Sequence, residues 1–522
     1  MAELNVEDGM KRAWFVVLGK RKLLVFLYSV FMAPVFAGNY FVAPAGNNSN
    51  IGSPQSPWAT LGHAVTKAQP GDTIFVRGGI YSEGEIWIRR EYGMGGRDGK
   101  YVTITAYPGE TPIFTNGSRG LIVDASYVRV SGLDFRNGKT LYNVDWAGPT
   151  DHVEFSRNRF SGSPDYAAID ITGDFNLVEG NIIEIAGNTV GTQGHGIYAM
   201  RGKNTVIRGN TISGATGYGI HLYEERRSGD PAGYIREIKN IVIENNFVFN
   251  SRERAGIIVG AGADSGPAHI DGVIIRHNVV IDNSSCGIVV NGWSEIENIQ
   301  IYNNTIHGNG DNGIQIFQKV KNVIIKNNIV CVKSGRRHID NAPNAPGVVV
   351  ERNLYCPAAP ALRHAQDSRP VNGDPLFADP ARKDFHLRQG SMAIDAGVNT
   401  GSAFTGAAPD LGAFEFDGAA EIRTGSLEIP ASFALEQNYP NPFNPETDIN
   451  FGLPTEAFVN LAIFDLLGRR VKTLVRGWLT PGWKVVKWNA RNEAGARVSS
   501  GIYLYRLAAG NFTAARRMVV LK

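Results

Sequence analysis

Short runs of alternating apolar and polar residues recur through the middle of the chain, and each ends in an asparagine followed by more apolar residues. In chain order these segments read HVEFSRNRF, NLVEGNII, NTVIRGNTI, NIVIENNFV, GVIIRHNVV, NIQIYNNTI, NVIIKNNIV and GVVVERNLY. Their aligned asparagines are Asn158, Asn181, Asn210, Asn246, Asn278, Asn304, Asn328 and Asn353. The spacings between them run from 23 to 36 residues, with a base period near 24 and insertions in the middle repeats. Such a period is typical of solenoids, so the pattern predicts stacked coils.

A second apolar strand begins about ten residues after each asparagine, and its successive copies read AIDI, GIYA, GIHLY, GIIV, GIVV and GIQI. One coil with two or three such strands cannot bury its apolar face, whereas stacked coils can. Equivalent residues would then stack about 4.8 Å apart, and stacked asparagine amides would hydrogen-bond along the stack. Because connections between parallel strands are almost always right-handed, the pattern predicts an all-β chain built on a right-handed parallel β-helix.

Two other repeat architectures fit the pattern less well. A leucine-rich repeat requires a leucine-dominated consensus, and a propeller requires four strands in roughly 40 residues. The repeats of this chain have neither feature.

The repeats and their flanking segments resemble the pectate-lyase-like family of right-handed β-helix proteins. The preceding segment, FVAPAGNNSNIGSPQSPWATLGHAVTKAQPGDTIFVRGGIYSE, is similar to the cap of many carbohydrate-active members, in which a strand, an amphipathic helix and a Gly-Asp turn cover the first coil. This resemblance implies a helix over residues 58–68, and such a cap hides strand edges that would otherwise be exposed. The later segments DPLFADPARKDFHLRQGSMAIDAG and APDLGAFEF are similar to the usual exit of these proteins. We expect the β-helix to occupy residues 38–416, and the resemblance specifies its fold better than its chemistry.

The character of the chain changes after Phe416. Residues 417–431 form a short polar linker, and residues 432–522 alternate as strands separated by glycine turns, which predicts a small β-sandwich. This region resembles the immunoglobulin-like C-terminal sorting domain of type IX secretion cargo in three motifs, NYPNPFNP at 438–445, DLLG at 465–468 and SGIY at 500–503. The resemblance implies that the type IX secretion machinery carries the chain across the outer membrane. An ordinary carbohydrate-binding sandwich is the alternative.

Residues 1–37 have the features of a signal peptide. The basic residues Lys20–Lys22 precede an apolar run over 23–37, and Val35 and Ala37 suit a cleavage site before Gly38. The run is short for a membrane span, which needs about 20 apolar residues. An uncleaved membrane anchor is the alternative. We therefore expect the protein to be secreted or attached to the cell surface.

Charge and cysteine content narrow the partners. The chain of 522 residues has a formal net charge of +3 with both signs well mixed, so it lacks the concentrated basic face that nucleic-acid binding requires. We also expect the protein to be a monomer. The three cysteines, Cys286, Cys331 and Cys356, are an odd number, which argues against a disulfide framework, and they have no metal-type spacing. Cys331 and Cys356 each stand three residues after an aligned asparagine. They either form a disulfide between adjacent coils after export or remain a reduced pair.

Candidate site residues gather on the strands that begin with Gly-Ile. Inserted loops mark the binding face of a solenoid, and the insertions here span residues 224–240 and 260–271. Side chains alternate along a strand, so the outward row beside these loops is expected to contain Asp170, Tyr198, His221, Ile258, Val289 and Gln315. The row two residues further on contains Thr172, Met200, Tyr223, Gly260, Asn291 and Phe317. The adjoining turns add His195, Arg201, Lys203, Glu224, Glu225, Arg226 and Arg254.

This mixture of aromatic, basic and acidic residues suits a sugar polymer. A lyase that cleaves a uronic-acid polymer needs a cation for the substrate carboxylate, a base for the C5 proton and an acid for the leaving oxygen. We expect His221 and Tyr198 to supply base and acid, with Lys203 as a competing base. One of Arg226, Arg254 and Arg201 would pair with the carboxylate. The other expected substrate contacts are Asp170, His195, Tyr223, Glu224, Glu225, Asn291 and Gln315.

Two other functions suit the same face. A glycoside hydrolase needs two carboxyl groups about 5–9.5 Å apart, which Asp170 and either Glu224 or Glu225 could supply. A non-catalytic, surface-displayed glycan-binding protein needs no such pair. No cofactor is certain: calcium could bind at Asp264 and Asp271, but the compact aspartate cluster of the calcium-dependent lyases is absent from the sequence. The sequence therefore favours a polysaccharide lyase that cleaves an acidic glycan by β-elimination, with a hydrolase or a binding protein as alternatives.

Overall fold

The computed structural model describes residues 37–521, apart from residues 116–119, 145–149, 163, 165, 186–192, 225–235, 263–267, 293–294, 344, 358–359, 417–422, 425–429, 431, 456, 480, 494 and 511. The predicted signal peptide, with its basic residues and apolar run, therefore lies almost entirely outside the described residues. Within the described ranges, no helix is long and apolar enough to cross a membrane.

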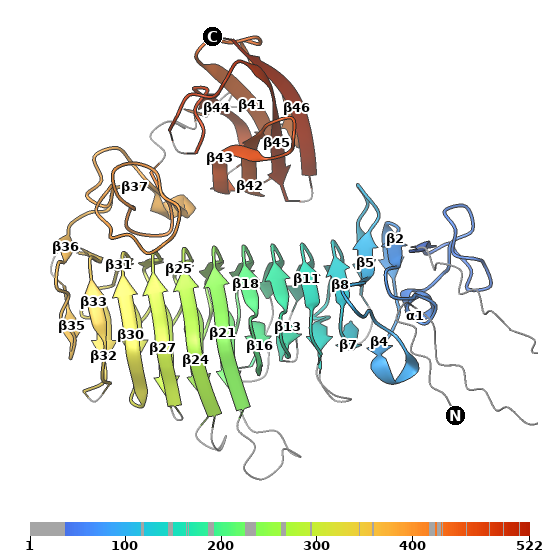
Figure 1. The fold of residues 1–522 in the computed structure, drawn as a ribbon, viewed down its shortest axis with the longest axis horizontal. Coiled ribbons are helices and arrows are strands. Elements are labelled where there is room, and N and C mark those ends of the chain that lie inside the picture. The colour runs from blue at the N-terminus through green and yellow to red at the C-terminus, as the bar shows by residue number, and fades with distance from the viewer. Residues whose placement is uncertain are drawn as a thin grey trace, which may run out of the picture. The chain divides into compact units, whose positions relative to one another are not determined.

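Three parallel sheets run along the stack of coils, and most coils contribute one strand to each (Figure 1). Sheet A contains β1 (Asn39–Val42), β2 (Thr73–Val76), β5 (Val102–Ala106), β8 (Val128–Ser131), β11 (Val153–Ser156), β14 (Leu177–Glu179), β18 (Val206–Arg208), β21 (Arg236–Glu244), β24 (Ala268–Arg276), β27 (Glu295–Tyr302), β30 (Val320–Lys326) and β33 (Val349–Glu351), with β17 (Gly202–Lys203) beside β21. Sheet B contains β3 (Gly79–Tyr81), β6 (Pro112–Phe114), β9 (Asp134–Phe135), β12 (Arg159–Gly162), β15 (Ile182–Ile185), β19 (Thr211–Ser213), β22 (Phe247–Phe249), β25 (Val279–Ile281), β28 (Thr305–His307), β31 (Ile329–Cys331), β34 (Leu354–Cys356) and β36 (Val371–Asn372).

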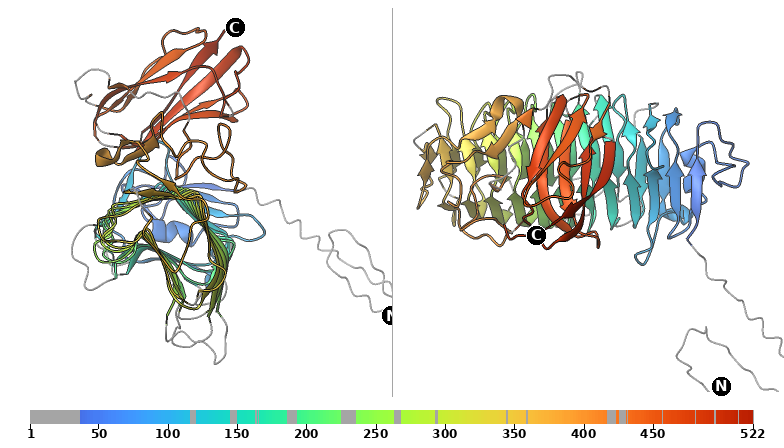
Figure 2. Two further views of the ribbon diagram at one scale, coloured as in Figure 1. Left: turned by 90° about the vertical axis from the view of Figure 1, so that its left-hand side faces the viewer. Right: turned by 90° about the horizontal axis from the view of Figure 1, so that it is seen from above.

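Sheet C is formed by the Gly-Ile strands and their neighbours. It contains β4 (Ile86–Arg89), β7 (Leu121–Asp124), β10 (Leu141–Asn143), β13 (Ala167–Ile171), β16 (His195–Ala199), β20 (Ile220–Glu224), β23 (Ile257–Ala261), β26 (Ile288–Gly292), β29 (Ile314–Ile316), β32 (Ile339–Asn341) and β35 (Leu362–Arg363). Seen along the stack, the strands of successive coils superpose (Figure 2, left). The predicted right-handed parallel β-helix is confirmed.

The core is built from columns of equivalent residues. In sheet C one isoleucine of each of six successive strands pairs from coil to coil and is fully buried, and all but the last follow a glycine: Ile197, Ile220, Ile257, Ile288, Ile314 and Ile339. Sheet B adds an aromatic column in which Phe114, Phe135 and Phe160 stack at 5.5 and 5.2 Å between ring centroids. Stacked β-branched and aromatic side chains fill the interior, and the repeat brings equivalent side chains into register.

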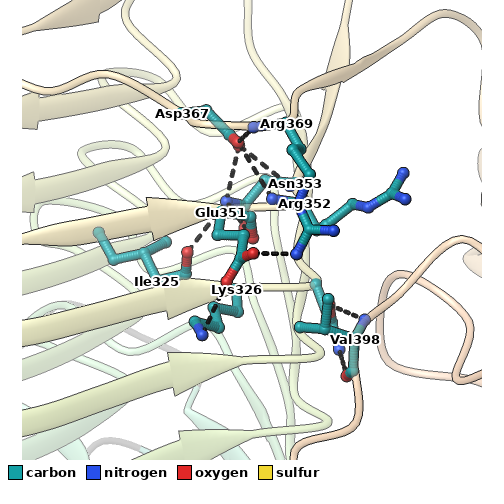
Figure 3. A network of polar contacts seen from close by, with 9 residues as sticks. Ile325, Lys326, Glu351, Arg352, Asn353, Asp367, Arg369 and Val398 are labelled. Carbon is teal, nitrogen blue, oxygen red and sulfur yellow. Dashed lines mark hydrogen bonds and ion pairs between the residues drawn. The ribbon is translucent and has the colours of Figure 1, made fainter.

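The aligned asparagines form a ladder through the interior. From Asn158 to Asn353 each Nδ2 donates to the Oδ1 of the next asparagine at 2.9–3.1 Å, and every member is buried. The Oδ1 of Asn158 accepts the backbone N–H of Leu133 at 3.1 Å. At the other end the Nδ2 of Asn353 donates to the Oδ2 of Asp367 at 3.0 Å (Figure 3). A carboxylate only accepts, so Asp367 terminates a chain of donors.

Asp367 collects several further donors at the last coils. It accepts the backbone N–H groups of Arg352, Asn353 and Arg369 at 2.9–3.1 Å and the hydroxyl of Tyr355 at 2.7 Å. Beside it, hydrogen bonds from Lys326 and Arg369 lower the pKa of Glu351 to about 2 (Figure 3). This network closes the C-terminal end of the ladder.

A disulfide joins two adjacent coils of sheet B. Cys331 and Cys356 are direct register partners in β31 and β34 and are bonded, with a Cα–Cα distance of 4.4 Å. This settles the alternative that the sequence left open between a disulfide and a reduced pair. Cys286 is buried and unbonded, and burial raises the pKa of its thiol to about 11.

The N-terminal cap contains a shorter helix than predicted. Helix α1 spans Leu61–Val65 rather than residues 58–68, and the side chain of Thr60 caps it by accepting the N–H of His63. Trp58 cannot join the helix because its backbone bridges to Val42, with N–H and C=O bonded to Phe41 and Ala43. A short 3₁₀ turn, η1 (Arg90–Tyr92), follows β4.

The two predicted insertions are partly strand. β21 and β24 each have nine residues and begin at Arg236 and Ala268, so sheet A takes in the ends of the segments expected to be loops. The early part of each strand pairs with its neighbour through buried isoleucines, Ile238 with Ile270 and Ile270 with Ile296. Burial of this extra column explains why the backbone continues as strand.

The exit segment covers part of sheet B. It contains β37 (Phe377–Asp379), the 3₁₀ turn η2 (Pro380–Arg382), β38 (Asp384–Leu387) and a turn region up to Phe416. Phe377, Phe385 and Leu411 pack with residues of β22, β25, β31 and β34 in one apolar cluster. The N–H of Val398 and its carbonyl bond the side chain of Asn327 at 2.9 and 2.7 Å (Figure 3).

The exit segment also holds a cluster of carboxyl groups, which predicts a local dependence on pH. Burial, with the charge of Asp395, raises the pKa of Asp410 to about 6, and burial, with the charge of Asp410, raises that of Glu415 to about 7. Both carboxyl groups have a higher pKa in the folded protein than in the unfolded chain. Their contribution to the stability of the segment is therefore fully present below the unfolded pKa and is lost as pH rises through about 6 to 7. We expect the amides of Thr405 and Phe416, which donate to these carboxylates, to exchange hydrogen more slowly at pH 5 than at pH 8 after correction for intrinsic rates.

The matched control is the double variant Asp410→Asn and Glu415→Gln, which should remove the difference between the two pH values. Equal protection of wild-type Thr405 and Phe416 at both pH values would contradict this prediction.

The C-terminal region is an antiparallel β-sandwich. One sheet has the order β39 (Arg423–Thr424), β44 (Gly482–Trp488), β41 (Thr447–Leu453) and β40 (Ala434–Leu435), and the other β43 (Arg470–Leu479), β42 (Ala457–Phe464), β45 (Gly501–Ala509) and β46 (Phe512–Val520). Strand β39 lies inside the stretch predicted to be linker. This part of the stretch is a strand because it pairs with β44. In the NYPNPFNP motif, the N–H of Asn438 donates to the Tyr505 hydroxyl and its Nδ2 to Thr447, at 2.8 and 2.9 Å.

Candidate functional site

A pocket of about 310 Å³ opens on the outer face of sheet C. Its described lining residues come from the turns and strands of five successive coils: Tyr166, Gln193, His195, Tyr218, His221, Tyr223, Arg254, Ile258 and Asn291. The strand register brings residues of successive coils together at this pocket. His221 of β20 pairs with Tyr198 of β16 on one side and with Ile258 of β23 on the other. The volume lies at the small end of the range for ligand-binding pockets.

Two histidines from adjacent coils touch in this pocket. The ring centroids of His195 and His221 are 4.3 Å apart, and the Nε2 of His195 lies 3.2 Å from the Nδ1 of His221. The backbone N–H of Tyr218 donates to the Nδ1 of His195 at 3.0 Å. Burial, with a contribution from Arg254, lowers the pKa of His195 to about 3. Burial, together with His195 and Arg254, lowers the pKa of His221 well below its ordinary value, so both rings are neutral near pH 7.

Tyrosine rings surround the histidines. The rings of Tyr198, Tyr218 and Tyr223 lie 4.6, 4.7 and 4.7 Å from that of His221, centroid to centroid. Tyr166 stands edge-on to His195 at 5.3 Å. Such rings offer flat apolar faces with polar edges, which suit the faces and hydroxyls of a sugar.

The pocket is electrostatically one-sided. The guanidinium of Arg254 lies 5.9 Å from the centroid of the Tyr218 ring, and burial raises the pKa of the Tyr218 hydroxyl. Among the described residues that line the pocket, Arg254 is the only permanent charge and no carboxylate occurs. The described lining therefore attracts an anionic group and offers nothing that repels one.

The structure brings five of the residues predicted for the site together in the pocket. They are His195, His221, Tyr223, Arg254 and Asn291. Tyr198 lies next to His221 in the predicted outward row, but it is fully buried and packs with Ala167 and Met200 behind the pocket. A direct exchange of a proton between Tyr198 and a substrate is therefore inconsistent with its burial.

Other predicted residues lie outside the pocket lining. Lys203 is in sheet A, where its Nζ forms an ion pair with Glu237 at 2.5 Å. Asp170 lies in β13 and is buried. Gln315 accepts a hydrogen bond from the side chain of Asn312 and donates one to the carbonyl of Asp340. Lys203 as a competing base and Asp170 as a substrate contact are not supported by this placement.

Arg201 and Glu224 lie at the ends of neighbouring sheet C strands and face each other. The backbone N–H of Arg201 donates to Glu224 at 3.2 Å, and the side chains approach to 3.9 Å. Glu224 is 1% exposed, so the carboxylate pair required for the hydrolase alternative is not presented to the pocket by Asp170 and Glu224.

Three further predictions concern residues of the inserted loops. Glu225, Arg226 and Asp264 lie outside the described residues. Asp271 is paired with Lys239 at 3.0 Å and accepts from Asn298 at 2.7 Å in sheet A. Within the described ranges, no group of three or more His, Cys, Asp or Glu residues is arranged to hold a metal ion.

Sequence reasoning missed Tyr166, Gln193 and Tyr218, which stand in the turns before the sheet C strands. Tyr218 and His195 are equivalent residues, each two positions before isoleucines that pair, Ile220 and Ile197. The sequence signal was the position two residues before each paired isoleucine. Examining that position would have identified both His195 and Tyr218, because both side chains line the pocket.

Comparison with known proteins agrees with this fold. Residues 40–162 match the family described as Pel9A-like, right handed beta helix region, residues 113–330 match the right handed beta helix region, and residues 437–521 match the secretion system C-terminal sorting domain. The solved structure of pectate lyase Pel9A superposes with a TM-score of 0.54 at 19% identity, covering 73% of this chain and 96% of that one.

Two curated relatives match more than two thirds of this chain. Pectate lyase L of Paenibacillus polymyxa (strain SC2) is 26% identical over 401 residues, which is 70% of this chain and 85% of the relative. The uncharacterized protein YwoF of Bacillus subtilis (strain 168) is 24% identical over 486 residues, 73% of this chain and 99% of its own length.

The fold and the sorting region define an exported protein built on a right-handed β-helix. More particularly, the chain is a right-handed β-helix protein that is similar to pectate-lyase-like proteins in its repeat region and has a type IX secretion C-terminal sorting domain. That domain indicates delivery to the cell surface or the exterior.

Proposed function

We propose that this protein is a polysaccharide lyase that cleaves an acidic, uronic-acid glycan by β-elimination at the pocket on sheet C. The observation that carries the proposal is the lining itself, in which one guanidinium, two neutral imidazoles and three tyrosines meet without a described carboxylate. Aromatic faces would stack on the sugar ring, while Arg254 would neutralise the sugar carboxylate. Pectate lyase L among the relatives supports a reaction of this class.

The residues can be assigned to the steps of the reaction. Removal of the C5 proton places negative charge on the substrate carboxylate, and Arg254 and an imidazole N–H of His221 would stabilise that charge. A neutral imidazole can serve as such an electrophile when its pKa is low. The base must be an ionised tyrosine, and Tyr218 beside Arg254 is the candidate, with Tyr223 as the alternative: the phenolate oxygen would accept the C5 proton and then donate it to the glycosidic oxygen as the C4–O bond breaks and the C4–C5 double bond forms, which restores the phenolate. Tyr198 would hold His221 in place from behind.

A non-catalytic glycan-binding function is the second candidate. It is favoured by the low pKa of both histidines, which makes them poor bases near neutral pH. The same aromatic and cationic lining would then serve recognition alone.

One assay separates the candidates. The purified full chain is incubated with a panel of uronic-acid polymers, and ultraviolet absorbance of the unsaturated product and new reducing ends are both followed. Rising absorbance is expected for the lyase, and its loss in His221→Gln would assign the activity to this pocket. Reducing ends without absorbance would mean hydrolysis, and retained binding without either signal would mean the glycan-binding protein.

A further inference from the structure

The hydrogen bonds of the histidine pair determine where their protons are. A backbone N–H can only donate, so the Nδ1 of His195, 3.0 Å from the N–H of Tyr218, carries no proton. A neutral His195 must therefore be protonated on Nε2, which faces the Nδ1 of His221 at 3.2 Å. The Nδ1 of His221 must then accept, so the proton of His221 is on its Nε2.

A second histidine in the same fold makes the equivalent contact and supports this assignment. His338 directly precedes the sheet C strand β32, and its Nδ1 accepts the N–H of Ala361, which stands one coil further on, at 3.0 Å. Its Nε2 lies 3.1 Å from the carbonyl of Cys356. A carbonyl can only accept, so His338 is protonated on Nε2. Both histidines thus accept a backbone N–H from the residue 23 positions later and donate from Nε2.

We propose that His195 is a positioning residue that locks His221 as a neutral Nε2–H donor, so that the pocket recognises an anionic sugar by donation rather than with a histidine base. The ligand class in this statement rests on the proposed function, whereas the proton assignment rests only on the hydrogen bonds. The proposal revises the role expected of His221 from its sequence position, which was that of base or acid together with Tyr198.

The groups around His221 keep it in this state. His195 and Tyr198 face it from β16, Tyr218 from the preceding turn, Tyr223 from its own strand, and Arg254 is the charged group that acts on it. These neighbours are neutral or cationic, so none favours an imidazolium. Protonation of His221 on Nδ1 would also turn two N–H groups toward each other across the 3.2 Å contact. The donor state should therefore persist across pH 5–8.

The test reads the protons directly. The full chain is labelled with ¹⁵N-histidine, its 10 histidines are assigned through single His→Gln variants, and ring nitrogen signals are followed between pH 8 and pH 5. His221 is expected to show a protonated Nε2, an unprotonated Nδ1 and no titration. The internal reference is His338, which should show the same pattern.

Variants of His195 separate positioning from packing. In His195→Gln the amide retains an acceptor and a donor, and His221 is expected to keep the wild-type pattern. In His195→Leu, His221 should populate both tautomers and titrate closer to its ordinary pKa. The matched control His338→Gln should leave His221 unchanged.

The proposal is overturned if wild-type His221 carries its proton on Nδ1, if it titrates near its ordinary pKa, or if a folded His195→Leu leaves its signals unchanged. Should His195→Leu fail to fold, the wild-type tautomer and titration decide alone. Absence of both product and glycan binding would overturn the proposed function without altering these signals, so the two failures are distinguishable.

Discussion

Replacing Asp367 with leucine is expected to lower the free energy of unfolding by about 4 kcal/mol, because each buried donor left without an acceptor costs roughly 1–3 kcal/mol. Asp367 is 6% exposed and accepts five hydrogen bonds, including the terminal amide of the asparagine ladder and the hydroxyl of Tyr355. Leucine has the same branching at Cγ but is larger and accepts none of them. In a solenoid each coil is stabilised mainly by its neighbours, so the damage should begin at the last coils. Urea unfolding and hydrogen exchange at Asn328 and Asn353 measure both effects.

Two variants control this experiment. Asp367→Asn keeps one accepting oxygen but turns an NH₂ toward donors, so its loss of stability should be intermediate. Asp311→Asn removes an exposed aspartate that pairs with Arg336, and it should change stability little. If Asp367→Leu were as stable as Asp311→Asn, the ladder would not depend on its terminal carboxylate.

Replacing Arg254 with methionine is expected to weaken binding or turnover of a uronic-acid polymer about 30-fold, or roughly 2 kcal/mol, since Arg254 supplies the charge for the sugar carboxylate. Methionine keeps much of the side-chain length and removes the guanidinium. Because the arginine is exposed, the effect should shrink as salt concentration rises. Isothermal titration with a uronate oligosaccharide, repeated at two salt concentrations, measures it.

The controls for Arg254→Met address charge and position. Arg254→Lys should retain part of the affinity, because an ammonium attracts the carboxylate but lacks the bidentate geometry. Arg336→Met removes an exposed arginine that is not among the pocket-lining residues, and it should leave the affinity unchanged. Unaltered uronate binding by Arg254→Met would mean that this pocket does not hold the sugar carboxylate.

The repeat allowed much of the fold to be predicted. Alternation placed Ile197 and Ile220 inside and His221 outside, and the register of sheet C agrees. Asparagine at each turn predicted a ladder, and the ladder exists. These predictions succeed because stacking places the same chemical group at the same position in every coil, so local pattern and tertiary contact coincide.

Where the repeat is broken, prediction was weaker. A helix was predicted over residues 58–68, but the observed helix spans only Leu61–Val65. The backbone of Trp58 is instead hydrogen-bonded to Phe41 and Ala43, which are distant in the sequence but adjacent in the cap. The nine-residue strand β21 extended into a segment predicted to be loop, because its neighbours supply an extra buried column. Non-repeating contacts of this kind leave no periodic signal.

The candidate site shows the same division. The sequence placed Tyr198 and His221 side by side, but only packing decided that Tyr198 is buried and that His221 reaches the pocket. Lys203, near in sequence, turned to sheet A and paired with Glu237. Distance along the chain says little about which sheet of a coil a turn residue will join.

The amino-acid sequence by itself determined the coil, the columns of its core, the sorting region and the face on which a site would lie, because each depends on recurring or local patterns. Tertiary structure decided which side chains of that face reach a ligand, which carboxylates are turned away and which nitrogen of His221 carries the proton. Those properties depend on burial and on single hydrogen bonds between coils, such as the one from Tyr218 to His195, and neither can be inferred from the order of residues alone.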